Sequence, residues 1–228
     1  MTTTSTAVIQ RALEAAHFDP GPIDNAWGPK TSRALKAYQT ANNLPATGLP
    51  NADTLAALLG TTAPLPILWL DEAERLLGLK EGAGAKDNAT ILDWADDLDI
   101  HFAADSIAWC GLFIAHVIRV ALPSEPLPGN PLGARNYLKL GTKVKPQVGA
   151  VGVFWRGTKD GWQGHVGLLV AESATSYCVL GGNQSDSVSY AWIAKSRLLE
   201  TRWPVSGSSP LNLPLPSKPG GVLSTNEA

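Results

Sequence analysis

Three polar residues of this chain have types and spacing suited to nucleophilic catalysis by a thiol. Cys110 ends a polar run and begins a stretch whose apolar residues recur at helical spacing, which predicts a cysteine in the first turns of an amphipathic helix. The positive end of a helix dipole favours the reactive thiolate. His165 opens an apolar run typical of a strand, and Asn183 closes the next such run. Together they could supply the nucleophile, the base and the orienting amide of a cysteine hydrolase.

Each of these residues also has a purely structural interpretation. Cys110 can be a small buried hydrophobe, His165 a surface residue at the start of a strand, and Asn183 a turn residue in the loop 181–186. Gln184 and Asp186 are alternative candidates for orienting the imidazole. The remaining histidines lie in the N-terminal region, in the loop before the predicted helix, and on the helix face opposite Cys110; they are His17, His101 and His116.

The elements that must bring the three residues together are a helix and a sheet. The helix presents one apolar face, formed by Cys110, Phe113, Ile114, Val117 and Ile118. Residues 148–155, 165–171 and 175–180 read as strands, and residues 122–145 as a long irregular stretch. A hairpin turn at 172–176 would set His165 opposite a position within one or two residues of Asn183. We therefore expect the helix to pack on this sheet with the cysteine near the edge of the interface.

The rest of the chain divides by composition and periodicity. Residues 1–60 read as a small unit of three helices, and residues 61–66 as a short, proline-stiffened linker. Residues 67–205 form the predicted catalytic domain, with further helices expected at 69–77 and 88–98. Residues 206–228, rich in Gly, Ser and Pro, are predicted to be a disordered tail.

Composition excludes several classes of function. The formal net charge is −2 and basic residues form no patch, which argues against nucleic acid as a partner. The N-terminus has no secretory signal, and no apolar run is long enough for membrane insertion. The two cysteines, Cys110 and Cys178, form no disulfide framework, and a single bridge between them stays open. No Cys/His spacing resembles a metal site, so we expect no metal and no cofactor.

Three motifs together resemble the CHAP/NlpC-type cysteine peptidases of bacterial cell walls, a papain-like superfamily. They are Ala-Trp-Cys-Gly-Leu-Phe at 108–113, Gln-Gly-His-Val-Gly at 163–167 and Leu-Gly-Gly-Asn-Gln-Ser at 180–185. The resemblance covers roughly residues 65–204. Many relatives have Gly-Asp before the first central strand, where this chain has Gly149-Ala150. That difference concerns local structure only, because the aspartate is neither nucleophile nor base.

The first sixty residues resemble a small helical peptidoglycan-binding module. The segment Pro-Ile-Asp-Asn-Ala-Trp-Gly-Pro-Lys-Thr at 22–31, Ala-Tyr-Gln at 37–39 and Thr-Gly-Leu-Pro at 47–50 fit its pattern. Relatives often have Asp-Gly where this chain has Asp24-Asn25. Asparagine also tolerates a positive φ, so the turn should be kept.

The two resemblances imply an α+β protein: a papain-like catalytic domain, with N-terminal helices packed on an antiparallel sheet, preceded by a three-helix peptidoglycan-binding domain. They imply a hydrolase that cleaves an amide in the peptide part of bacterial peptidoglycan, with Cys110, His165 and Asn183 as catalytic residues and the backbone N–H of Cys110 as an oxyanion donor. Trp109 and Tyr137 are the expected substrate-binding residues, although Trp109 can instead pack in the core.

A phage-type endolysin fits these features best. Such a protein is expected to be a monomer that stays in the cytoplasm of the host bacterium until lysis and then acts on the cell wall. The alternatives are a toxin effector or a housekeeping wall amidase with the same chemistry, and a wall-binding protein without catalysis. The residue types and their spacing do not distinguish an endopeptidase from an amidase.

Overall fold

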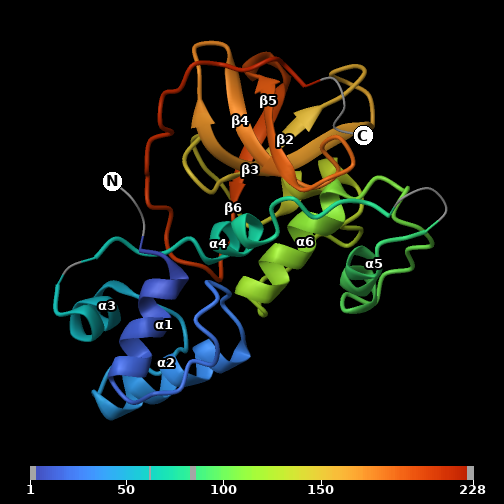
Figure 1. The fold of residues 1–228 in the computed structure, drawn as a ribbon. Coiled ribbons are helices and arrows are strands. Elements are labelled where there is room, and N and C mark those ends of the chain that lie inside the picture. The colour runs from blue at the N-terminus through green and yellow to red at the C-terminus, as the bar shows by residue number, and fades with distance from the viewer. Residues whose placement is uncertain (1–3, 62, 83–85, 225–228) are drawn as a thin grey trace.

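The computed structural model describes residues 4–61, 63–82 and 86–224 (Figure 1). Residue 62 of the predicted linker and residues 225–228 of the predicted tail lie outside the described residues. The helices are α1 (Thr6–Ala15), α2 (Pro29–Ala41), α3 (Ala52–Leu59), α4 (Leu68–Arg75), α5 (Ala89–Asp96), α6 (Cys110–Ala121) and the short 3-10 helices η1 (Ala134–Lys139) and η2 (Lys195–Arg197). The strands are β1 (Thr142–Lys143), β2 (Val151–Trp155), β3 (Gly164–Glu172), β4 (Ser176–Gly181), β5 (Ser189–Ala194) and β6 (Leu198–Trp203).

The N-terminal helices α1, α2 and α3 form a small bundle. Proline occupies the first position of α2, where its missing N–H has no helical partner to lose. Asn51 caps α3, as the sequence predicts, since its side chain accepts a hydrogen bond of 2.9 Å from the backbone N–H of Thr54. Ile9, Leu13 and Leu35 are fully buried between the helices.

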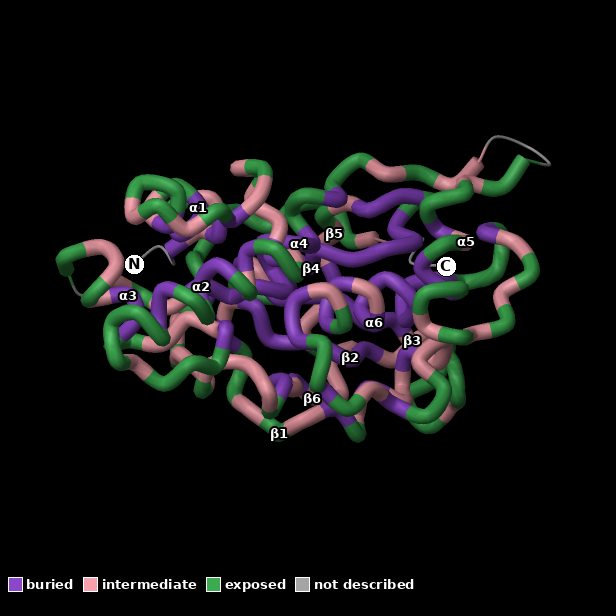
Figure 2. The backbone as a smooth tube through the Cα atoms, turned by 90° about the horizontal axis from the view of Figure 1, so that it is seen from below, coloured by how far each residue is buried: buried purple, intermediate pink, exposed green. Residues whose placement is uncertain are grey.

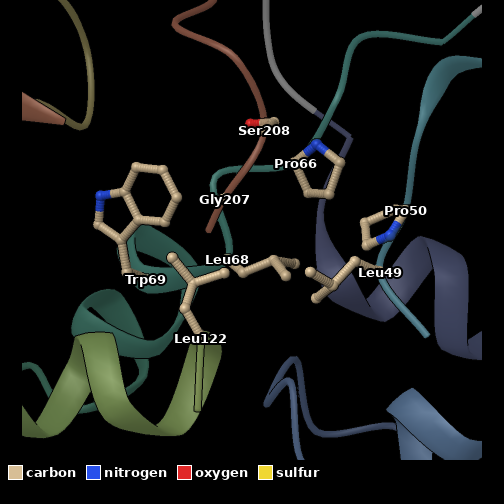
Figure 3. Close-up of a pocket in the computed structure, with 8 residues that line it drawn as sticks. All are labelled: Leu49, Pro50, Pro66, Leu68, Trp69, Leu122, Gly207 and Ser208. Atoms are coloured by element: carbon tan, nitrogen blue, oxygen red, sulfur yellow. The ribbon is translucent and has the colours of Figure 1, made fainter. Parts of the chain in front are cut away.

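The bundle is joined to the rest of the chain by more than the linker. The backbone N–H and the hydroxyl of Thr6, at the start of α1, donate to Oδ2 of Asp71 on α4 at 2.8 and 2.7 Å. Figure 3 shows the apolar contact beside these hydrogen bonds, where Leu49 of the N-terminal unit faces Leu68 of α4, with Leu122 below. The cavity between these side chains is only about 10 Å³, so the N-terminal unit and α4 are nearly in contact here.

The described strands form a six-stranded antiparallel sheet in the order β1-β6-β2-β3-β4-β5. Helix α6 packs on one face of this sheet, against β3 and β4, and α4 packs on α6. Figure 2 shows that the buried backbone is concentrated around α6 and the neighbouring strands. The fold is therefore a mixed one of helices and antiparallel sheet, with the predicted cysteine helix at its centre.

The other face of the sheet carries a second apolar cluster, and the C-terminal segment covers it. This cluster consists of Phe154, Leu169, Tyr177, Val179, Ile193 and Leu215. Residues 206–224 run along the sheet: the carbonyl of Leu213 accepts from the N–H of Val148 at 3.1 Å, and that of Pro216 from the N–H of Glu172 at 3.0 Å. The predicted disorder is wrong for this part of the tail. Its prolines prevent a helix, but its leucines bury an apolar surface that the strands leave open.

Within the described residues, the structure contains no helix with the length and apolar character that crossing a membrane requires.

Candidate functional site

Cys110 is the first residue of α6, as predicted. Its side chain is buried, and the backbone N–H groups of Val166 and Gly111 donate hydrogen bonds to the sulfur. Burial raises the pKa of the Cys110 thiol above its ordinary value, and these N–H groups and the positive charge of Arg156 lower it only in part. In this structure desolvation therefore has a larger effect on the pKa of the thiol than the field of the helix end, which favours thiolate.

His165 is the second residue of β3 and is fully buried. Its Nε2 lies 3.1 Å from Oε1 of Gln184. An amide oxygen can only accept, so this contact assigns the proton of a neutral ring to Nε2 and leaves Nδ1 as the basic nitrogen. Because Val166 follows His165 directly, the Cys110 sulfur that contacts the Val166 N–H lies beside the peptide bond joining these two residues.

The side chain of Gln184 is itself fixed in position. Its amide nitrogen donates to the carbonyls of Val179 and Gly181 at 3.3 Å each, and also to the carbonyl of Ser189. These three acceptors settle which end of the amide faces the histidine. The orienting residue of the imidazole in this structure is therefore Gln184, which the sequence offered only as an alternative.

Asn183 does not occupy the predicted position. It has a φ of 54°, is buried, and its Oδ1 has no hydrogen-bond partner among the described residues. The left-handed conformation turns the chain after β4, so that the next side chain, Gln184, folds back beneath the strand end. Hairpin register alone predicts the neighbourhood of His165 to within a residue, but the turn decides which amide reaches the ring.

The two predicted substrate-binding residues are both fully buried, so that assignment is wrong. Trp109 donates from Nε1 to Oε1 of Glu81 at 2.6 Å and packs against Trp94. The hydroxyl of Tyr137 donates to the carbonyl of Gly111 at 2.6 Å. Both side chains hold the first turn of α6 in place, and neither can line a groove.

A cleft of about 180 Å³ opens beside Cys110 instead. Its walls come from the residues before α6, from η1 with the loop before it, and from the loop between β2 and β3; they include Ala108, Leu132, Gly133, Ala134, Arg156, Trp162, Gln163 and Gly164. Sequence analysis missed Arg156 and Trp162. A signal was available, since Trp162 interrupts a polar turn a few residues before His165.

The other reactive side chains lie elsewhere. His116 stacks on Trp94 at 4.5 Å and lies 3.6 Å from Glu72, on the side of α6 away from the cleft. Cys178 is a free cysteine, as is Cys110, so the two form no bridge. No group of three or more His, Cys, Asp or Glu side chains in the described parts of the chain could hold a metal ion.

The comparisons with known proteins concern the N-terminal bundle. Residues 3–58 match a family model described as a peptidoglycan binding domain. Neither the search of curated proteins nor the search of solved structures found a match. This match supports a peptidoglycan-binding module in the bundle of α1, α2 and α3, with peptidoglycan as a partner and an association with the cell wall.

Proposed function

We propose that residues 67–205 form a papain-like cysteine hydrolase that cleaves an amide bond in the peptide part of peptidoglycan. The observation that carries the proposal is the position of the Cys110 sulfur, at a helix N-terminus and against the peptide that follows His165, whose ring is held by Gln184. An open cleft gives the thiol an approach for substrate. The peptidoglycan-binding module supports the choice of polymer.

The proposed reaction proceeds through a thioester. His165 accepts the proton of Cys110 as the sulfur attacks the amide carbon, which forms a C–S bond and an oxyanion. The backbone N–H of Cys110, at the start of α6, is the proposed donor to that oxyanion. The C–N bond then breaks, and the amine leaves with the proton held by His165. Water attacks the thioester, His165 takes its proton, and the acid is released as the thiol is restored.

The raised pKa of Cys110 fits this order of events. A buried neutral thiol becomes nucleophilic only when the base takes its proton, so the free enzyme would hold little thiolate. The biological role that we propose is that of a phage-type endolysin, and a toxin effector or a housekeeping amidase would use the same chemistry.

The test is the clearing of purified cell walls, followed as turbidity. Wild type and Cys178→Ser, which changes the other buried cysteine, should clear the walls, whereas Cys110→Ser and His165→Ala should not. Mass spectrometry of the released fragments then identifies the bond. A new amine on the first stem residue shows an amidase, and one within the stem or cross-link shows an endopeptidase. If wild type binds walls and releases nothing, the chain is a wall-binding protein without catalysis.

A further inference from the structure

Trp162 is unusually exposed for a tryptophan at the edge of a cleft. Its side chain is 85% exposed, on the loop between β2 and β3, and it lines the same cleft as Cys110. A single exposed apolar side chain is common on protein surfaces and carries no meaning by itself. Trp162 differs from such side chains because hydrogen bonds fix the backbone of its loop.

The guanidinium of Arg135, in η1, fixes the loop by three hydrogen bonds to backbone carbonyls. It donates to Gln163 at 2.7 Å, to Lys159 at 2.9 Å and to Thr158 at 3.0 Å. The backbone N–H of Arg156 also donates to the carbonyl of Gln163 at 3.2 Å, which closes the base of the loop. The backbone that carries the indole is therefore ordered before any ligand arrives, so binding to it loses less conformational entropy.

The shape and chemistry of this position suit a ring with an apolar face. An indole with most of its surface exposed, at the edge of the Cys110 cleft, is a flat and open platform against which the C–H face of a saturated ring can lie. The cleft beside it, at about 180 Å³, is smaller than the usual pocket for a whole ligand and can enclose only part of a glycopeptide. The remaining part must lie at the rim, where the indole is.

We propose that Trp162 is a binding platform for a sugar ring of the glycan strand, positioned so that the attached peptide enters the Cys110 cleft. This inference rests on the proposed function, because it assumes that the cleft receives the peptide. It adds a substrate class: the preferred substrate is a peptide that still carries its sugar.

The kinetic test compares two substrates. One is a disaccharide-peptide released from walls by a glycosidase, and the other is the synthetic stem peptide of the same sequence. Trp162→Ala should raise KM for the disaccharide-peptide roughly tenfold, the size of one aromatic contact, with kcat unchanged. KM for the free peptide should rise much less, because that peptide has no sugar ring to lose its contact with the indole. Trp162→Tyr keeps a ring and should restore most of the affinity, and Tyr190→Ala, which removes another exposed aromatic side chain away from this cleft, should have no effect.

A second measurement separates this inference from the proposed function. Alkylation of Cys110 by iodoacetamide, followed by peptide mapping, reports occupancy of the cleft even in a protein without turnover. The disaccharide-peptide should protect Cys110 in wild type, and Trp162→Ala should need roughly tenfold more of it. The sugar platform would be overturned if Trp162→Ala weakened the protection of Cys110 equally for the disaccharide-peptide and the free peptide, or weakened it for neither. Absence of turnover with sugar-dependent protection would instead refute catalysis and leave the platform standing.

Discussion

The carboxamide oxygen of Gln184 lies 3.1 Å from Nε2 of His165, while the neighbouring amide of Asn183 makes no such contact. Gln184 should therefore be the residue whose loss disturbs the imidazole. We expect Gln184→Leu to lower kcat on wall fragments by about 100-fold with little change in KM, since a displacement of a reacting group by about 1 Å has an effect of that size.

The matched control for this prediction is Asn183→Gly. Glycine adopts the positive φ of position 183 without strain, so this variant removes the amide and keeps the turn. It should retain activity within about three-fold of wild type, because the Asn183 amide makes no contact with the imidazole that could be lost. A large loss in Asn183→Gly together with an active Gln184→Leu would reverse the two roles.

The reactivity of Cys110 should follow its burial. Because burial raises the pKa of the thiol above its ordinary value, its alkylation rate in the free protein should keep rising with pH through the alkaline range. The measurement is the rate of iodoacetamide labelling against pH in a Cys178→Ser background, so that only Cys110 reacts. A plateau reached below neutral pH would contradict this and would mean that the free enzyme holds a stable thiolate.

The burial of Asp71, on α4 beside Thr6, should make stability depend on pH. Burial raises the pKa of Asp71 to about 6, although the hydrogen bonds from Thr6 oppose this. The folded protein thus binds the proton more tightly than the unfolded chain, and this contribution to stability is present below about pH 4 and is lost as the pH rises to about 6. Between these two pH values the free energy of unfolding should fall by roughly 3 kcal/mol through this group.

Asp71→Asn tests this directly. An asparagine cannot ionise, so the variant should gain stability relative to wild type as the pH rises from 4 to 7, by roughly 2 to 3 kcal/mol in the free energy of unfolding from urea titrations. Asp53→Asn removes the same single negative charge at an exposed position of α3 and provides the comparison. A difference between Asp71→Asn and wild type that stays constant across this range would count against the linkage.

The C-terminal segment should contribute measurably to the stability of the sheet. Leu215 buries its side chain in the second apolar cluster, so Leu215→Ala should reduce the free energy of unfolding by about 2 kcal/mol, at the low end for a buried leucine because the site lies near the surface. Val222→Ala, at a side chain that is almost fully exposed, should change it by less than about 0.5 kcal/mol. Equal effects of the two substitutions would show that the segment does not cover the sheet in solution.

The elements that carry the candidate site were predictable because each has a clear hydrophobic period. The helix beginning at Cys110 and the strands around His165 are in the structure, with boundaries shifted by a few residues at most. Strands β5 and β6 were not predicted. Several of their side chains are half-exposed, so their sequences mix polar and apolar residues without the continuous apolar run of β4.

The errors within the site have a common cause. Residue type and spacing do not report which way a side chain points after a turn, so Gln184 and not Asn183 contacts the ring. Nor do they report depth: Trp109 and Tyr137 are aromatic residues near the cysteine, but hydrogen bonds to Glu81 and Gly111 hold them inside. The exposed aromatic is Trp162, whose loop is ordered by the distant Arg135.

The paired hydrogen bonds from Thr6 to Asp71 have a mechanical consequence. Two units connected only by a flexible tether search a volume whose radius grows with the length of that tether. Here hydrogen bonds connect the first turn of α1 to α4 of the larger unit. The cleft therefore keeps a fixed orientation relative to the N-terminal bundle and to any glycan strand bound to it. If the cleft cleaves peptidoglycan as proposed, it reaches only bonds at a fixed distance from the place where the bundle binds. The bundle must then dissociate and bind again before the cleft reaches another bond.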